Sequence, residues 1–178
     1  MLPILTGNKV KLRPKRLYDA IDDYQWRQDT ELCRLDATQP TTSSFEEYLR
    51  LSAESPSQTS RSCHFAIETF SGKHIGNCSC FDVDEANGEV EIGIMIGNKA
   101  YWDQGYGADA IRTALDYVFS RKELDRVYLK TLNWNTRAQK CFQKCGFSPC
   151  GQLIRDGHSF ILMEIRKPQK TTAQLKKE

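Results

Sequence analysis

The segment AYWDQGYGA, residues 100–108, is the most informative stretch of the sequence, because it joins a strand pattern to a helix pattern through two closely spaced glycines. Glycines allow a tight turn and leave the backbone open to a close neighbour. A helix that begins at such a turn adds unpaired N–H donors and the positive end of its dipole. The segment therefore predicts a site for a phosphate or pyrophosphate. The alternative is a tight turn that needs its glycines for geometry alone.

The common nucleotide-binding motifs do not describe this turn. The sequence contains no G-x4-G-K-[ST] stretch, which excludes a P-loop. Gly105-x-Gly107 is followed by Asp109 and Ala110, so the dinucleotide fingerprint G-x-G-x-x-G is absent as well.

The residues on either side of the turn show two different periods. Before it, aliphatic side chains alternate with other residues over 90–97, which predicts a strand. After it, apolar residues follow the spacing of an amphipathic helix. These residues are Ile111, Ala114, Leu115, Val118 and Phe119. A further strand is predicted over 126–133, and then a helix with Asn135 as its N-cap and Gly146 as its stop.

The remaining patterns predict a mixed fold. A helix over 18–28 and another with Ser44 as its cap and Glu47 three residues on are expected. Asn87-Gly88 and Asp156-Gly157 are hairpin dipeptides. Further strands are predicted over 10–14, 64–69, 74–81, 151–155 and 159–165, and a loop over 55–62. We expect an α+β fold: a mostly antiparallel sheet of about six to seven strands, about four helices and one parallel β-α-β crossover.

Length and charge limit the classes of function. Residues 1–167 are expected to form a single domain, and 168–178 a polar, disordered tail. The net charge is +2, of which the stretch from Arg166 onward supplies +4, so the body is slightly acidic. This balance argues against nucleic-acid binding. No apolar run approaches the roughly 18 residues of a membrane span, and the N-terminus does not resemble a targeting peptide, so a cytoplasmic protein without membrane contact is expected.

The cysteine pattern indicates reduced thiols rather than a disulfide framework or a metal site. Their number is odd, which disfavours complete disulfide pairing, and reduced thiols are typical of the cytosol. No C-x2-C pair is present, so no structural metal is predicted. The seven are Cys33, Cys63, Cys78, Cys80, Cys141, Cys145 and Cys150.

The full pattern resembles the GNAT superfamily of N-acetyltransferases from about Lys9 to Lys167. The turn is similar to that family's [QR]-x-x-G-x-[GA] pyrophosphate loop, with Trp102 where the family prefers Gln or Arg. The segment Asn135-x-Arg137-Ala138, followed by Gly146-Phe147, resembles its second cofactor segment. The opening LTGNKVKLRP, residues 5–14, resembles the RimJ/RimL branch, which includes ribosomal-protein N-terminal, polyamine and drug acetyltransferases.

The resemblance implies transfer of an acetyl group from acetyl-CoA to a primary amine, by direct attack in a ternary complex. The acceptor would be the N-terminus of a protein or peptide, a polyamine or another small amine, and the family also allows a homodimer. No metal is implied. The residues that would bind acetyl-CoA are Ile94, Met95, Ile96, Trp102, Gln104, Gly105, Tyr106, Gly107, Ala108, Asn135, Arg137 and Phe142. An N–H group of Met95 or Ile96 would polarise the thioester carbonyl.

Glu91 is the first candidate for the general base, because an amine must be neutral to attack. It matches an acidic position that the family often uses, and a solvent-facing or paired glutamate is the alternative. Glu89 could exchange roles with it, and His64 and Asp82 are further candidates. His74 and His158 are expected to lie on the surface near turns.

The general acid is missing from its family position. Phe142 stands where the family often has a tyrosine, and it cannot donate a proton. Cys141 is expected to be a core residue rather than a substitute. A non-catalytic acyl-CoA-binding or regulatory module therefore stays open as the second function. The acceptor groove is expected to be built from the first helices and the final hairpin, and simple helix packing is the alternative role for its residues. The candidates are the aromatic Tyr24, Trp26 and Trp134 and the charged Arg27, Asp29 and Glu31.

Overall fold

The computed structural model describes residues 2–54 and 62–168, which form an eight-stranded sheet with five α-helices. The strand order is β1-β2-β3-β4-β5-β6-β8-β7. Every neighbouring pair is antiparallel except β5 and β6, which are parallel. The expected α+β class and the single parallel crossover are thus confirmed.

The sheet has one more strand than the upper limit of the prediction. The two-residue β1 is too short for a periodic pattern to reveal it. The strands are β1 (Leu5–Thr6), β2 (Val10–Pro14), β3 (Cys63–Thr69), β4 (His74–Asp84), β5 (Glu89–Ile96), β6 (Arg126–Leu132), β7 (Ser148–Arg155) and β8 (His158–Arg166).

The helices also exceed the prediction by one. A single helix was expected over 18–28, but a second follows directly, because the Asp29 side chain accepts hydrogen bonds from the amides of Glu31 and Leu32 and starts it. The expected caps are confirmed: Ser44 accepts from the Glu47 amide, and Asn135 from the Ala138 amide. The helices are α1 (Asp19–Gln28), α2 (Thr30–Leu35), α3 (Phe45–Glu54), α4 (Tyr106–Ser120) and α5 (Thr136–Lys144), with a 3₁₀ turn η1 (Lys99–Tyr101).

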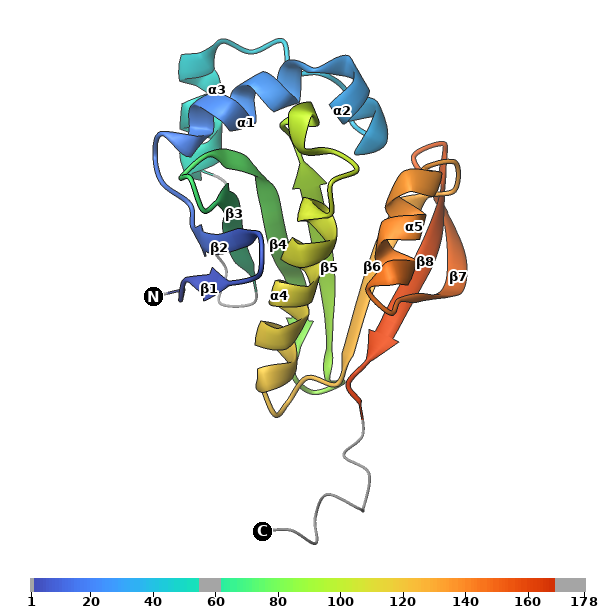
Figure 1. The fold of residues 1–178 in the computed structure, drawn as a ribbon. Coiled ribbons are helices and arrows are strands. Elements are labelled where there is room, and N and C mark those ends of the chain that lie inside the picture. The colour runs from blue at the N-terminus through green and yellow to red at the C-terminus, as the bar shows by residue number, and fades with distance from the viewer. Residues whose placement is uncertain (1, 55–61, 169–178) are drawn as a thin grey trace, which may run out of the picture.

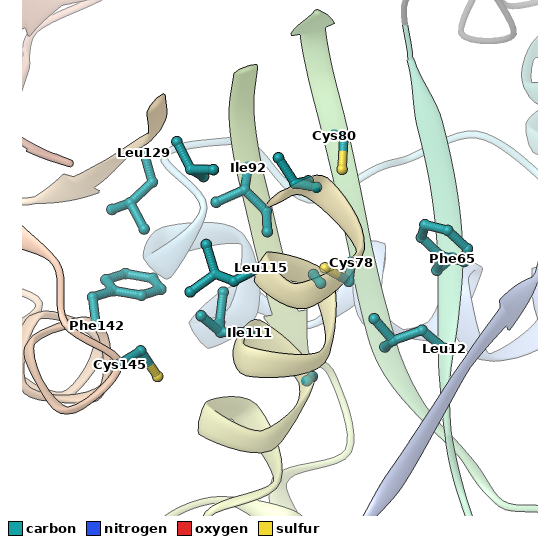
Figure 2. Packing of buried hydrophobic residues seen from close by; sticks show 14 of the residues in the cluster. Leu12, Phe65, Cys78, Cys80, Ile92, Ile111, Leu115, Leu129, Phe142 and Cys145 are labelled. Carbon is teal, nitrogen blue, oxygen red and sulfur yellow. The ribbon is translucent and has the colours of Figure 1, made fainter. Parts of the chain in front are cut away.

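The main core lies between the sheet and the helices α4 and α5, which stand in front of it in Figure 1. Alternation along β5 turns Val90 and Ile92 toward α4, where Ile111 and Leu115 meet them. Figure 2 shows this packing extending from Leu12 and Phe65 on one side to Phe142 and Cys145 on the other. This shared core fixes α4 and α5 relative to β5 and β6.

Strands β5 and β6 separate after three paired residues. Their parallel register joins Glu89, Val90 and Glu91 to Arg126, Val127 and Tyr128, and no pairing follows. Figure 1 shows the two strands diverging upward, with α4 and α5 on either side of the gap and α2 near its upper end. In the described part of the chain, the edge of β5 that faces β6 therefore has no strand partner beyond Glu91, whereas its other edge stays paired with β4.

A buried charge cluster fixes α1 to the sheet. The Arg13 guanidinium donates to both oxygens of Asp19 (2.7 and 2.8 Å) and to Glu68, and all three residues are buried. His74 lies beside them, with Nδ1 3.0 Å from Asp22 and Nε2 3.0 Å from the Gly76 carbonyl.

The surface position expected for His74 is therefore wrong, because α1 folds over the hairpin that carries it. His158 is half-buried against Phe160. The loop expected over 55–62 and the tail beyond 168 lie almost entirely outside the described residues.

Candidate active site

A cavity of about 400 Å³ occupies the split between β5 and β6. Four parts of the chain line it: the second half of β5, the glycine turn, α5 and the helix α2. Of the twelve residues predicted to bind acetyl-CoA, ten line the cavity. They are Ile94, Met95, Ile96, Trp102, Gly105, Gly107, Ala108, Asn135, Arg137 and Phe142.

The other two predicted residues turn their side chains elsewhere. The Gln104 side chain donates to the Ala100 carbonyl, and the Gln104 carbonyl accepts from the Lys9 ammonium. The Tyr106 ring packs edge-on against Tyr101, 5.0 Å between centroids. Both side chains stabilise the turn, so only the backbone of Gln104 and Tyr106 is left to contact a ligand.

The glycine turn presents free amides to the cavity. Gly105 has φ 84°, a left-handed conformation that glycine adopts without strain. The first intrahelical bond of α4 runs from the Asp109 amide to the Gly105 carbonyl, so the amides of Tyr106, Gly107 and Ala108 precede it. Unpaired donors at a helix start favour an anion.

Asp109 fixes the turn from behind, a role that sequence periodicity did not reveal. Its carboxylate accepts from three successive backbone amides, those of Asn8 (3.1 Å), Lys9 (2.7 Å) and Val10 (3.1 Å). The residue is 6% exposed. The Asp109 carboxylate is thus fully engaged by the β1–β2 connection, and these hydrogen bonds anchor the first turn of α4 to it.

Trp102 closes the turn against two neighbours. Its indole N–H donates to the Ile96 carbonyl at 2.6 Å, and the Arg137 guanidinium carbon lies 3.5 Å from its ring centroid. The stacking is a close cation–π contact. Trp102 therefore joins the end of β5 to the first turn of α5.

The free edge of β5 supplies backbone groups to the cavity. The Met95 carbonyl faces β4, since a side chain at Gly76 would lie 2.1 Å from it. The Ile96 carbonyl faces the opposite way, toward Trp102. The C=O and N–H of one trans peptide group point to opposite edges of a strand. The Ile96 N–H therefore faces away from β4 and is the better placed of the two amides predicted to polarise a carbonyl.

Glu91 lies at the point where the split begins. It is the last residue of β5 that pairs with β6, and its side chain is 16% exposed on the face opposite Val90 and Ile92. The Lys130 ammonium on β6 lies 2.8 Å from its carboxylate. Glu91 is not among the residues that line the cavity, so it would act on an acceptor that arrives from the other face of the sheet.

The other candidate bases are held by other contacts. Glu89 is ion-paired with Arg126, which also binds Glu164. His64 Nδ1 lies 2.9 Å from the Ser79 hydroxyl, and Asp82 is exposed at an irregular point of β4. Burial, followed by the charges of Glu91 and Asp82, raises the pKa of Tyr128, which disfavours it as an anionic base.

Phe142, at the position where the family often has a tyrosine acid, and its neighbour Cys141 differ in exposure. Phe142 is 7% exposed, packs on Phe147 and forms part of the cavity wall. Cys141 was expected to be a core residue; it is partly buried and packs against the core, and it also lines the cavity. A hydrogen bond with Cys145 lowers the pKa of Cys141 to about 7, and Lys144 and Arg112 act in the same direction.

Helix α2 supplies the part of the cavity wall that the sequence did not predict. Leu32, Leu35 and Asp36 line the cavity from this helix. Lys99 pairs with Asp29 and Glu31, and Arg34 lies 4.7 Å from the Trp134 ring centroid. These contacts hold α2 beside η1 on one side of the split and beside the β6–α5 connection on the other.

Two of the three aromatic residues expected at the acceptor groove pack against neighbouring side chains, whereas Trp134 is exposed beside Arg34 of α2. Trp26 is buried against His74, and Tyr24 packs on Phe45 and Tyr48.

Across residues 2–54 and 62–168, no group of three or more His, Cys, Asp or Glu side chains is arranged to hold a metal ion. None of the helices in these two ranges has the length and apolar character to cross a membrane.

The split parallel strand pair, the free strand edge and the glycine turn at a helix start all lie within the stretch of the chain that a known family model matches. A model of the Acetyltransferase (GNAT) domain matches residues 9–148. The chain belongs to the GNAT acetyltransferase family.

Curated relatives share about half of the chain. An uncharacterized N-acetyltransferase, p20, from Bacillus licheniformis is 33% identical over 82 residues, which are 46% of this chain and 45% of that protein. A spermidine N(1)-acetyltransferase from Vibrio cholerae is 26% identical over 52% of this chain and 53% of its own length. The chain thus spans about half the length of the curated relatives it matches.

Solved structures resemble the whole fold. A spermidine N-acetyltransferase from Vibrio cholerae, in complex with CoA and spermine, has a TM-score of 0.78 at 21% identity, over 88% of this chain and 95% of that one. An aminoglycoside acetyltransferase in complex with coenzyme A has a TM-score of 0.74 at 18% identity, over 89% and 95%. At these identities the likeness establishes the fold.

Proposed function

We propose that this protein transfers an acetyl group from acetyl-CoA to a primary amine by direct attack in a ternary complex. The observation that carries the proposal is the cavity in the β5–β6 split, which combines three free amides of α4 with the unpaired edge of β5. The amides of Tyr106, Gly107 and Ala108 suit a pyrophosphate. The edge at Ile94–Ile96 suits the amide-containing pantetheine arm, which would pair with it as an added strand.

Chemistry would take place along the free edge of β5, between Glu91 at the closed end of the split and Ile96 at the end of the strand. The Ile96 N–H stabilises the oxyanion that forms when the amine attacks the thioester. Glu91 accepts the amine proton, directly or through a water molecule, from the face of the sheet opposite the cofactor. The thiolate of CoA leaves without a tyrosine acid, because a thiol with a pKa of roughly 8.5 is a tolerable leaving group.

The acceptor is an amine of a protein N-terminus, a polyamine or another small amine, as the RimJ/RimL-like opening of the sequence suggests. The neighbouring enzyme from Vibrio cholerae binds spermine, which supports a small polyamine as one member of the test panel.

The test is release of CoA thiol from acetyl-CoA across peptides with Ser or Ala at the N-terminus, spermidine and an aminoglycoside. Turnover on one class, with the acetylated amine identified by mass spectrometry, would establish the reaction and its acceptor class. Failure to bind acetyl-CoA in calorimetry would contradict the proposal.

The second candidate function is a non-catalytic acyl-CoA-binding module, favoured by Phe142 at the position of the usual acid. It predicts tight binding of acetyl-CoA with no turnover on any member of the panel. The same two measurements therefore distinguish the two functions.

A further inference from the structure

The connection between β1 and β2, residues 7–9, packs against the first turns of α4 (Figure 1). The Gly7 amide donates to the Val10 carbonyl at 2.8 Å, which closes the connection into a tight turn. Neither these residues nor Asp109, which they contact, are among the residues that line the cavity. The connection therefore supports the glycine turn from outside the site.

The carboxylate of Asp109 joins α4 to this connection. One of its oxygens accepts from the Asn8 amide at 3.1 Å, and the other from the amides of Lys9 and Val10 at 2.7 and 3.1 Å. Hydrogen bonds to a charged acceptor are roughly twice as strong as those between neutral groups, and only 6% of Asp109 is exposed. Since Asp109 directly follows Ala108, these bonds fix the backbone next to the three free amides of α4.

The Lys9 side chain holds the other end of the turn. Its ammonium donates to the Gln104 carbonyl at 2.9 Å and lies 5.3 Å from the centroid of the Tyr106 ring. Gln104 and Tyr106 flank Gly105, the residue with the left-handed conformation. The same short connection thus holds the chain on both sides of the three free amides, through Lys9 before them and through Asp109 after them.

The contact between the connection and α4 leaves no room for a side chain at Gly7. A methyl group there would lie 2.5 Å from Asp109 Oδ2 and closer still to the hydroxyl oxygen of Thr113. Thr113 is itself buried and donates to the Asp109 carbonyl at 2.8 Å. The close approach therefore requires glycine, and a larger residue would push the connection away from the Asp109 carboxylate.

The charge of Asp109 has two opposed effects at this position. The helix dipole favours an acidic residue in the first turn of α4, but the same charge repels an anion bound at the free amides. The hydrogen bonds of Asp109 act in the other direction, because donors that are already fixed lose no conformational freedom when a ligand binds. Charge and ordering therefore predict opposite effects on anion binding when the carboxylate is removed.

We propose that Asp109 is a positioning residue for the cofactor: through the β1–β2 connection it holds the three free amides of α4 in the conformation that binds the pyrophosphate of acetyl-CoA. The inference rests on the proposed function, in which these amides bind that group. It adds residues 7–10, which do not line the cavity, to the part of the chain that sets cofactor affinity. Acceptor binding is independent of this contact, because Glu91 lies on β5.

The experiment measures the dissociation constant of acetyl-CoA by calorimetry in the unmodified protein and in three variants. Asp109→Asn keeps the shape of the side chain but turns an NH₂ group toward backbone N–H donors, and we expect about tenfold weaker binding. Gly7→Ala leaves the carboxylate in place and displaces the connection, so it should weaken binding as well. Asp19→Asn is the matched control: it removes a buried carboxylate that accepts from a backbone amide outside the cavity, and it should lower stability while keeping the affinity.

Two further measurements separate positioning from a merely structural role. On an acceptor that the protein acetylates, Asp109→Asn should raise the KM for acetyl-CoA and leave kcat at saturating acetyl-CoA unchanged, because only cofactor binding is lost. Simple destabilisation would instead lower kcat with the folded fraction and leave KM as it is. Hydrogen exchange of the amides of residues 106–108 should become faster in Asp109→Asn and Gly7→Ala, but not in Asp19→Asn.

An acetyl-CoA affinity that is unchanged or higher in a folded Asp109→Asn variant would overturn the inference, as would an equal loss of affinity in Asp19→Asn. Circular dichroism would show whether each variant folds. If Asp109→Asn does not fold, Gly7→Ala decides: weaker binding supports the inference, and unchanged binding overturns it. Failure of the unmodified protein to bind acetyl-CoA would instead contradict the proposed function, and the inference with it.

Discussion

The Lys130 ammonium of β6 lies 2.8 Å from the Glu91 carboxylate of β5 and comes two residues after Tyr128, the last residue of β6 that pairs with β5. The pair is partly buried, with the Lys130 and Glu91 side chains 27% and 16% exposed. The candidate base is thus held at the closed end of the split by a cation from the strand that diverges from it. An acceptor amine that reaches Glu91 would compete with Lys130 for the same carboxylate.

Glu91→Gln should lower kcat at pH 7 by about 10²- to 10⁴-fold, because an amide cannot accept the amine proton. The loss should shrink at higher pH, where a larger fraction of the acceptor is already neutral. The measurement is a pH profile of kcat on the best acceptor of the panel, with acetyl-CoA affinity measured alongside. Glu123→Gln, at an exposed position away from the cavity, is the control; a Glu91→Gln variant with full activity would assign the base elsewhere.

Gly107→Ala and Gly107→Val should weaken acetyl-CoA binding progressively while the fold is retained. A methyl group at Gly107 would meet only Ile96 and Cys141, at 3.6 and 3.8 Å, which is ordinary contact. It would also occupy the space over the free amides, and we expect a loss of about tenfold or more for valine. Calorimetry gives the affinity and thermal melting the stability, and a folded Val variant with unchanged affinity would remove the turn from the binding site.

Asp19→Asn should destabilise the fold by on the order of 3 kcal/mol, because it breaks a buried ion pair and leaves Arg13 with Glu68 alone. Burial by itself would raise the pKa of Asp19, but hydrogen bonds from Arg13 and from the Arg16 amide outweigh it, so the pKa lies below its ordinary value. The stabilisation is therefore present above about pH 4 and lost as the pH falls through the lowered pKa.

Urea denaturation at several pH values measures this effect. The difference in unfolding free energy between the unmodified protein and Asp19→Asn should be full at pH 7 and decrease in acid. Asp116→Asn, at an exposed position of α4, is the control and should change stability little. A difference between Asp19→Asn and the unmodified protein that grows in acid would mean that folding raises the pKa of Asp19 instead of lowering it.

Cys141 should react with iodoacetamide at a rate that rises through about pH 7, where its pKa lies, because the thiolate is the nucleophile. Acetyl-CoA should protect it, since the residue lines the cavity. Peptide-resolved mass spectrometry would measure the extent of labelling over roughly pH 5.5–9, about the range in which thiols titrate. Cys150 is exposed outside the cavity and serves as the unprotected control; equal labelling of Cys141 with and without acetyl-CoA would place it outside the site.

Strong local patterns predicted most elements within a few residues. The alternation over 90–97 corresponds to β5 (Glu89–Ile96), and the caps at Ser44 and Asn135 are where they were expected. The misses have physical reasons. The two-residue β1 and the six-residue α2 are too short to display a period, and α2 begins at a side-chain cap rather than at an apolar pattern.

Burial was harder to predict than secondary structure. His74 follows a turn, and its sequence neighbours gave no sign that α1 would cover it with Asp22 and Trp26. Cys141 lies on the helix face that pattern alone assigns to the core, yet it borders the cavity because β6 has moved away from β5 at that height.

From the sequence we could predict the family, the mixed sheet, the glycine turn and ten of the nineteen residues that line the cavity, because these depend on residues close together in the chain. The tertiary structure alone decided the partners across the split: Lys130 for Glu91, Arg137 for Trp102, and α2 beside both halves. Periodicity reports which way a side chain points relative to its own strand or helix. Which distant side chain it meets depends on how strands and helices pack, and on where β5 and β6 stop pairing.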